Sequence, residues 1–251
     1  MAEAQPFSTK VRLLLERLTG RKILKRLPHG NDVFGDIRHV LKAKPMQIFF
    51  DVGAHYGETA LEMLQVFPSA QVYSFEPSVH SFSILKANTA GLNCECINLA
   101  MGSKSGTVDV SISDDGAQSG MNSIINQSGS GDSLRKETFT VSTVDEFCEQ
   151  HSIKHIDYLK IDTEGYDLEV IYGADQMLRS GSIDFVQAEV SMNPTNMFHV
   201  SGDKVKSHME GLNYVLFGMY DQTLEWITRR PVLRRVNMVF INLSLAEKMR
   251  Y

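Results

Sequence analysis

Cysteine is scarce in this sequence, with three residues among 251. A small and odd number of cysteines excludes a disulfide-stapled scaffold, because such scaffolds carry many paired cysteines in a short chain. Proline is also infrequent, with seven residues, while hydrophobic residues make up 43% of the chain. This composition is typical of a globular protein with a substantial core, and it excludes a disordered or collagen-like chain.

Long hydrophobic runs are also missing. No apolar stretch approaches the roughly 18 residues that cross a bilayer, and the N-terminus lacks a signal-peptide pattern. We therefore expect a cytoplasmic protein without a transmembrane segment. The net charge is −5, but residues 1–50 carry +6 and residues 51–251 carry −11. The basic N-terminal part and the acidic remainder need separate explanations.

The basic N-terminal part has helical periodicity. From Thr9 to Leu27, leucines at helical spacing are interleaved with seven Lys or Arg residues, which predicts an amphipathic helix or helix pair broken near Gly20. We interpret residues 1–45 as a helical extension that forms a lid or packs in a homodimer, with binding to a membrane surface or a nucleic acid as the alternatives. Nucleic acid is not an expected partner, because the remainder is acidic and lacks an N-P-P-Y block.

Residues 46–251 alternate short apolar runs with segments of helical periodicity, which predicts one α/β domain built on a doubly wound parallel sheet. Strands are expected at residues 46–50, 71–75, 94–97, 107–112, 139–143, 156–161, 183–190, 214–219 and 236–243. Helices are expected at residues 59–67, 79–90, 144–151, 167–178 and 204–210. Residues 113–135 are rich in Ser, Gly, Asp and Asn, which is typical of a long surface loop.

Two acidic residues follow the first two predicted strands. Asp51 opens the turn Asp-Val-Gly-Ala-His-Tyr-Gly, in which Gly53 and Gly57 permit close approach of the backbone to a ligand. An acid here would repel a pyrophosphate but suits a ligand with a cationic centre, such as the methionine half of S-adenosylmethionine. Glu76 follows the second strand, where a carboxylate can accept the ribose hydroxyls of an adenosine. Either acid could instead serve only the local turn.

Four motifs together resemble the FkbM family of S-adenosylmethionine-dependent methyltransferases. They are D-V-G-A-H-Y-G from Asp51, F-E-P from Phe75, N-L-A-M-G from Asn98 and L-K-I-D-T-E-G from Leu159, and the similarity runs from about Ile48 to Leu243. The resemblance implies a class I methyltransferase fold, a Rossmann-like sheet of seven strands with the last one antiparallel. It also implies methyl transfer to an oxygen of a small metabolite or glycan, either a hydroxyl or an acidic oxygen.

The resemblance also implies a set of cofactor contacts. Asp51, Gly53, Ala54 and Gly57 would line the methionine side of S-adenosylmethionine, and Glu76 would bind the ribose. The adenine would lie near Asn98, Ala100 and Met101. His55 stands where the family usually has Asn, so it could alter how the methionine end is held, act as a further acid–base group, or be an ordinary surface histidine.

A base should lie near the transferred methyl group, because an alcohol must lose its proton. Asp162 and Glu164 follow the strand at 156–161, and Glu189 ends the next strand, so their carboxylates are expected at the mouth of the cleft. They could provide the base, bind Mg²⁺, or, for Asp162 and Glu164, cap the following helix. His199, in the loop after Glu189, is the other candidate base.

Two other functions remain open at this stage. One is a Rossmann-type oxidoreductase, although the turn lacks the third glycine of the nicotinamide fingerprint. The other is a binding module for S-adenosylmethionine that has lost turnover.

Cys94 and Cys96 are expected on opposite faces of one strand, which would exclude a redox pair or a zinc knuckle. Acceptor specificity should depend on the loops at residues 113–135, 191–203 and 220–233, including Gly120–Ser123 and Asn193–Asn196.

Overall fold

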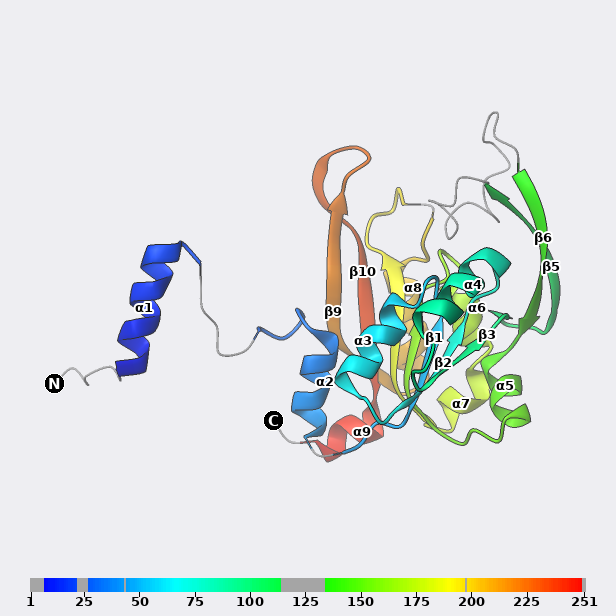
Figure 1. The fold of residues 1–251 in the computed structure, drawn as a ribbon, viewed down its shortest axis with the longest axis horizontal. Coiled ribbons are helices and arrows are strands. Elements are labelled where there is room, and N and C mark those ends of the chain that lie inside the picture. Colours follow the sequence, from blue (N-terminus) through cyan, green and yellow to red (C-terminus); the bar gives the residue numbers. More distant parts are fainter. Residues whose placement is uncertain (1–6, 22–26, 43, 114–133, 197, 250–251) are drawn as a thin grey trace.

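The computed structural model describes residues 7–21, 27–42, 44–113, 134–196 and 198–249. Its main feature is a seven-stranded sheet with the order β3-β2-β1-β7-β8-β10-β9 (Figure 1). The strands of this sheet are β1 (Ile48–Val52), β2 (Gln71–Phe75), β3 (Cys94–Ile97), β7 (Ile156–Ile161), β8 (Ile183–Ser191), β9 (Tyr214–Glu225) and β10 (Arg230–Asn242). Strand β10 runs antiparallel to both β8 and β9, whereas β3, β2, β1, β7 and β8 pair in parallel. The predicted doubly wound sheet with an antiparallel last strand is confirmed.

Helices cover both faces of this sheet, which creates two hydrophobic layers. One layer contains side chains from α5 (Val144–Gln150), α6 (Asp167–Tyr172), α7 (Asp175–Arg179) and α8 (Gly202–Gly211). The other contains side chains from α2 (Val33–Leu41) and α3 (Glu58–Val66), with α9 (Leu243–Lys248) at its margin. Because Phe34 and Ile37 of α2 are fully buried there, part of the expected N-terminal extension belongs to the folded body. The central strands β7 and β8 are buried along their whole length, as parallel strands covered on both faces must be.

A second, smaller sheet was not expected as a unit. It consists of β4 (Ala100–Met101), β6 (Leu134–Ser142) and β5 (Gly106–Ser113), in that spatial order. The two long strands β5 and β6 were predicted as separate short strands, but their antiparallel pairing joins them into one ribbon beside β3 and α4 (Val79–Asn88) (Figure 1). Most of the predicted loop at 113–135 lies outside the described residues, and so does Gly120–Ser123.

Three local predictions were wrong. The helix expected over residues 167–178 is divided into α6 and α7 at Gly173, where a Cβ atom would lie 2.0 Å from the carbonyl oxygen of Gly102. The last two strands are longer than expected, so Pro231 lies within β10 rather than in a loop. Cys94 and Cys96 share one face, with their sulfur atoms 4.0 Å apart, because residues two positions apart on a strand point the same way.

The N-terminal helix α1 (Phe7–Thr19) stands away from the sheet in Figure 1. Its Leu14 and Leu18 side chains are exposed. The predicted break near Gly20 agrees with the end of α1, while residues 22–26 lie outside the described part of the chain. The roles of residues 1–45 as a lid or as a contact in a homodimer stay predictions. No helix among the described residues is both long enough and apolar enough to span a bilayer.

Phe50 provides a test of the core beneath the site. It is fully buried on β1 and its ring contacts Tyr73, Phe75 and Phe147 at centroid distances of 5.2 to 5.7 Å. We expect Phe50→Ala to lower the free energy of unfolding by about 3–5 kcal/mol, because it removes a buried ring and leaves a cavity. Urea denaturation measures this change. The matched variant Leu92→Ala, at a half-exposed position, should stay within about 0.5 kcal/mol of the wild type. Equal losses in the two variants would contradict the assignment of the core.

Candidate active site

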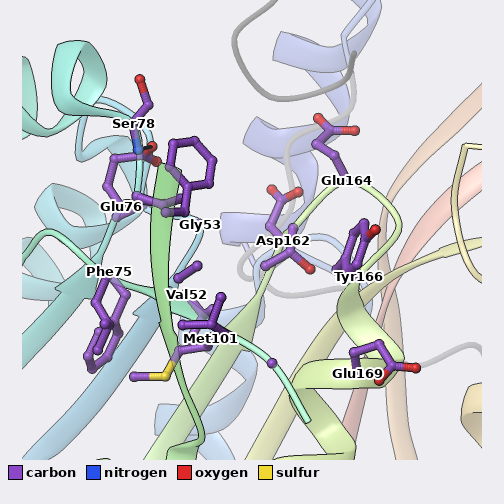
Figure 2. Close-up of a pocket in the computed structure, with 18 of the residues that line it drawn as sticks. Val52, Gly53, Phe75, Glu76, Ser78, Met101, Asp162, Glu164, Tyr166 and Glu169 are labelled. Carbon is purple, nitrogen blue, oxygen red and sulfur yellow. Dashed lines mark hydrogen bonds between the residues drawn. The ribbon is translucent and has the colours of Figure 1, made fainter. Parts of the chain in front are cut away.

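A large cavity opens at the carboxyl ends of β1, β2 and β7, where parallel α/β sheets bind ligands. It has a volume of about 660 Å³. Figure 2 shows Glu76 and Ser78 on one side of the cavity and Asp162, Glu164 and Tyr166 on the other. The small sheet closes the cavity with the apolar side chains Val108, Phe139 and Val141. The cavity is therefore apolar along one wall and acidic at the strand ends.

Eight of the predicted site residues line this cavity: Gly53, Ala54, His55, Glu76, Ala100, Met101, Asp162 and Glu164. The structure brings these residues together from four separate motifs. Four other predicted residues, Asp51, Gly57, Asn98 and His199, are not part of the lining. The contacts of each of these four residues explain why it does not line the cavity.

Asp51 is fully buried and does not face the cavity, contrary to its predicted position. The Nζ atom of Lys160 lies 3.0 Å from its Oδ1 atom and also donates a hydrogen bond to the carbonyl oxygen of Gly53. Burial alone lowers the pKa of Lys160, but attraction to Asp51 and Asp162 raises it overall, so the ammonium stays charged. Asp51 thus acts through this ion pair, which joins the ends of β1 and β7.

The turn after β1 depends on its two glycines. Gly53 has a φ of +76°, and a Cβ atom there would lie 1.9 Å from the carbonyl oxygen of Asp162. Gly57 has a φ of +94° at the N-terminus of α3, and its Cα faces Leu85 of the neighbouring helix rather than the cavity. Gly53 therefore allows the strand ends to meet, whereas Gly57 allows helix packing.

Glu76 is the best-anchored acid of the cavity. It is buried, and its two carboxylate oxygens accept hydrogen bonds from the backbone N–H groups of His55 and Ser78, each at 2.9 Å. Burial raises its pKa to about 7, although both of these hydrogen bonds oppose the shift. Asn98 supports the same segment, because its side-chain amide donates hydrogen bonds to the carbonyl oxygens of Glu76 and Pro77. Asn98 thus positions the Glu76 segment instead of lining the cavity.

His55 lies at the open edge of the site. Its ring stacks on that of Tyr56 with the centroids 3.6 Å apart, and its Nδ1 atom lies 3.5 Å from Glu58 Oε1. Its φ of +49° belongs to the left-handed region, where Asn and His are more frequent than most other residues. His55 therefore satisfies the backbone requirement of the turn.

His199 lies in a buried cluster next to the cavity. Its Nε2 atom is 2.6 Å from Glu189 Oε2 and 3.5 Å from Glu164 Oε2, and its other ring nitrogen lies 3.0 Å from the side-chain amide of Asn196. Burial lowers the pKa of His199, but the two carboxylates outweigh this effect and raise it to about 9. Arg235 forms an ion pair with the other oxygen of Glu189. Among these residues, only Glu164 reaches the cavity wall.

The residue that holds the Glu164 loop was not predicted from the sequence. Asp167, fully buried at the start of α6, accepts hydrogen bonds from the hydroxyl of Thr163 and the backbone N–H groups of Gly165 and Glu189. Burial, followed by repulsion from Asp162 and Glu189, raises its pKa to about 7. Glu164 itself has a φ of +51°, so the loop needs this support.

Lys160, Gln187 and Arg235 were missed as well. All three are polar residues on strands whose other positions are mostly apolar and buried. For Lys160 and Gln187, a polar residue between two apolar neighbours was the signal available in the sequence, whereas Arg235 follows another arginine.

With the geometry described, the chain can be compared with known proteins. Residues 51–216 match the family described as the methyltransferase FkbM domain. The chain belongs to the FkbM methyltransferase family. The hexuronic acid methyltransferase AglP of Haloferax volcanii is 25% identical over 175 residues, which cover 68% of this chain and 69% of AglP.

One solved structure agrees in fold. The methyltransferase FkbM of Methylobacillus flagellatus KT aligns with a TM-score of 0.51 at 14% identity, over 77% of this chain and 43% of that longer one. The chain thus spans less than half of that protein. The M. capricolum TrmK in complex with S-adenosyl-homocysteine aligns with a TM-score of 0.46 at 13% identity, over 82% of this chain and 67% of that one. The predicted family and fold class are confirmed.

The raised pKa of His199 predicts a pH-dependent contribution to stability. Since its pKa rises from 6.5 to about 9 in the folded protein, His199 stabilises the fold fully below pH 6.5, and this stabilisation is lost as the pH rises through about 9. We expect His199→Gln to cost about 2–3 kcal/mol more at pH 6 than at pH 10. Urea denaturation at both pH values measures the difference. The exposed His80→Gln variant should show none, and a pH-independent cost for His199→Gln would contradict the ion cluster.

Proposed function

We propose that this protein is an S-adenosylmethionine-dependent O-methyltransferase that acts on a hydroxyl group of a small metabolite or glycan. Family membership and the acid-anchored cavity at the strand ends together support this function. Similarity to a hexuronic acid methyltransferase supports a sugar-containing acceptor. S-adenosylmethionine supplies the methyl group, and the protein must hold it against the acceptor hydroxyl.

Glu76 carries the proposal most directly. Its carboxylate lies in the cavity wall, and backbone N–H groups fix the position of both its oxygens. A carboxylate still has lone pairs that can accept the two hydroxyl groups of a ribose. The methionine end would lie at Gly53, Ala54 and His55, and the adenine would lie against Ala100 and Met101.

Asp162 and Glu164 are the proposed acceptors of the hydroxyl proton, because both line the cavity opposite Glu76 (Figure 2). In the reaction, the acceptor oxygen forms a bond to the methyl carbon, the carbon–sulfur bond breaks, and the hydroxyl proton goes to a carboxylate. His199 acts through Glu164, so it is a positioning residue. Holding both substrates in line can supply roughly 7–11 kcal/mol, more than a positioned base contributes.

Mg²⁺ forms no part of this proposal. Glu164, Glu189 and His199 each place one potential ligand atom within 4.8 Å of the others. However, Mg²⁺ favours an all-oxygen shell with several waters, whereas Glu189 and His199 are buried and His199 offers an imidazole nitrogen. Arg235 and His199 also already balance the charge of Glu189. This donor set therefore does not fit Mg²⁺, which the sequence offered as one alternative for the carboxylates of Asp162, Glu164 and Glu189.

Calorimetric titration with S-adenosylmethionine and S-adenosylhomocysteine tests the function. We expect saturable binding that weakens about 10–100-fold in Glu76→Gln, because a charge-assisted hydrogen bond contributes about 1.5–3 kcal/mol. The exposed Glu95→Gln variant should bind as the wild type does. Absence of saturable heat at millimolar ligand would refute the proposal, as would unchanged affinity in Glu76→Gln.

The pKa of Glu76 adds a pH test. Since this pKa is about 7 in the free protein, the carboxyl group is largely protonated at pH 6 and ionised at pH 8. The ionised form accepts hydroxyl groups better, so affinity for S-adenosylhomocysteine should rise as the pH passes through 7. The same titrations of Glu76→Gln should show a flat profile. A parallel rise in both proteins would assign the effect to another group.

A further inference from the structure

A second cavity adjoins the first on the side of α2 and α3. It has a volume of about 150 Å³ and lies between the starts of these helices and strands β7, β8, β9 and β10. Thr59, Lys160 and Asp162 line both cavities. Asp162, one of the proposed proton acceptors, therefore lies between the two spaces.

Two residues that line this second cavity carry side-chain hydrogen-bonding atoms with no partner among the described residues. Gln187 is more than nine-tenths buried, and its Oε1 atom accepts a hydrogen bond from Tyr158, while its Nε2 atom has no partner among the described residues. The Nδ2 atom of Asn237 donates to Asp221, whereas its Oδ1 atom is buried and has no hydrogen-bond partner in the same part of the chain. One free donor and one free acceptor are what a hydroxyl group can satisfy at once.

The charge of the cavity restricts the ligand further. Asp32, Glu62 and Asp221 contribute carboxylates to its lining. Lys160 is the one basic residue among the described lining, and its ammonium group already contacts Asp51 and the carbonyl oxygen of Gly53. Burial, followed by repulsion from Asp221 and Asp32, raises the pKa of Glu62, which shows that these carboxylates interact. A ligand carboxylate would meet the same repulsion.

We infer that this second cavity is the acceptor subsite and that it takes a hydroxyl-bearing group that is uncharged or cationic, not a uronate. Carboxylates at its rim accept hydrogen bonds from sugar hydroxyls or an ammonium group, and Gln187 and Asn237 bind a further hydroxyl. The volume suits one hydroxylated part of a molecule, since it corresponds to about five water molecules. This inference rests on the proposed function and narrows its substrate class.

Saturation-transfer NMR on the protein saturated with S-adenosylhomocysteine tests the subsite. The probes are methyl β-D-glucoside, methyl β-D-glucosaminide and methyl β-D-glucuronide at equal concentration. We expect saturation transfer to the glucoside and the glucosaminide and at least fivefold less to the glucuronide. Equal or stronger transfer to the glucuronide would overturn the inference, and so would transfer to none of the three.

Variants of the lining residues test whether the saturation-transfer signal comes from binding in the second cavity. Asp221→Asn and Glu62→Gln should each weaken glucosaminide binding at least threefold, and the double variant should bind the glucuronide as well as the glucoside. Glu149→Gln, at an exposed position on α5, is the matched control and should bind all probes as the wild type does. Unchanged binding in both single variants would place the probes elsewhere.

Calorimetry separates this inference from the proposed function. If S-adenosylhomocysteine binds but no glycoside does, the subsite is wrong while the methyltransferase function stands. If S-adenosylhomocysteine itself fails to bind, the proposed function fails first. Thermal unfolding of each variant confirms that lost binding does not reflect lost folding.

Discussion

The buried ion pair between Lys160 and Asp51 is the interaction on which the site depends. These residues lie on neighbouring strands, β7 and β1, and both side chains are almost completely excluded from solvent. Removing one partner of such a pair leaves an uncompensated charge in the interior. This destabilises the fold far more than replacing both partners with hydrophobic residues would. Lys160 also donates a hydrogen bond to the carbonyl oxygen of Gly53, so the ion pair fixes the first residue of the turn after β1. Lys160 and Gly53 both line the cavity, so the ion pair holds this part of the cavity wall in place.

Much of the fold follows from the sequence because its signals are local. The apolar runs at β2, β3 and β7 were predicted with the bounds that the structure shows, since each is a short run ended by a turn. The division between α6 and α7 was not predictable in this way. It arises from the close approach of Gly173 to Gly102, two residues far apart in sequence, and helical periodicity does not register such a contact.

The candidate site shows the same difference between residues marked by local signals and residues placed by tertiary contacts. Glu76 and Gly53 could be placed at the cavity because they directly follow strands whose order the alternation predicts. The buried position of Asp51 could not be predicted, because it depends on the ion pair with Lys160. From the sequence, Lys160 looks like one more polar residue in a strand. His199 was recognised as a titratable group, but its burial behind Glu164 is a result of tertiary packing alone.

The β9–β10 hairpin contacts the loop between β8 and α8 through aromatic, ionic and hydrogen-bonded side chains. Arg234 pairs with Glu225 at 2.8 Å, and its guanidinium group lies 4.7 Å from the ring centroid of Trp226 and 5.7 Å from that of Phe198. Asn193 donates a hydrogen bond to the same Glu225. As a result, Asn193 and Phe198 each contact the hairpin, one through Glu225 and the other through Arg234. Loss of the Glu225 carboxylate would therefore affect Arg234 and Asn193 together, because both side chains contact it.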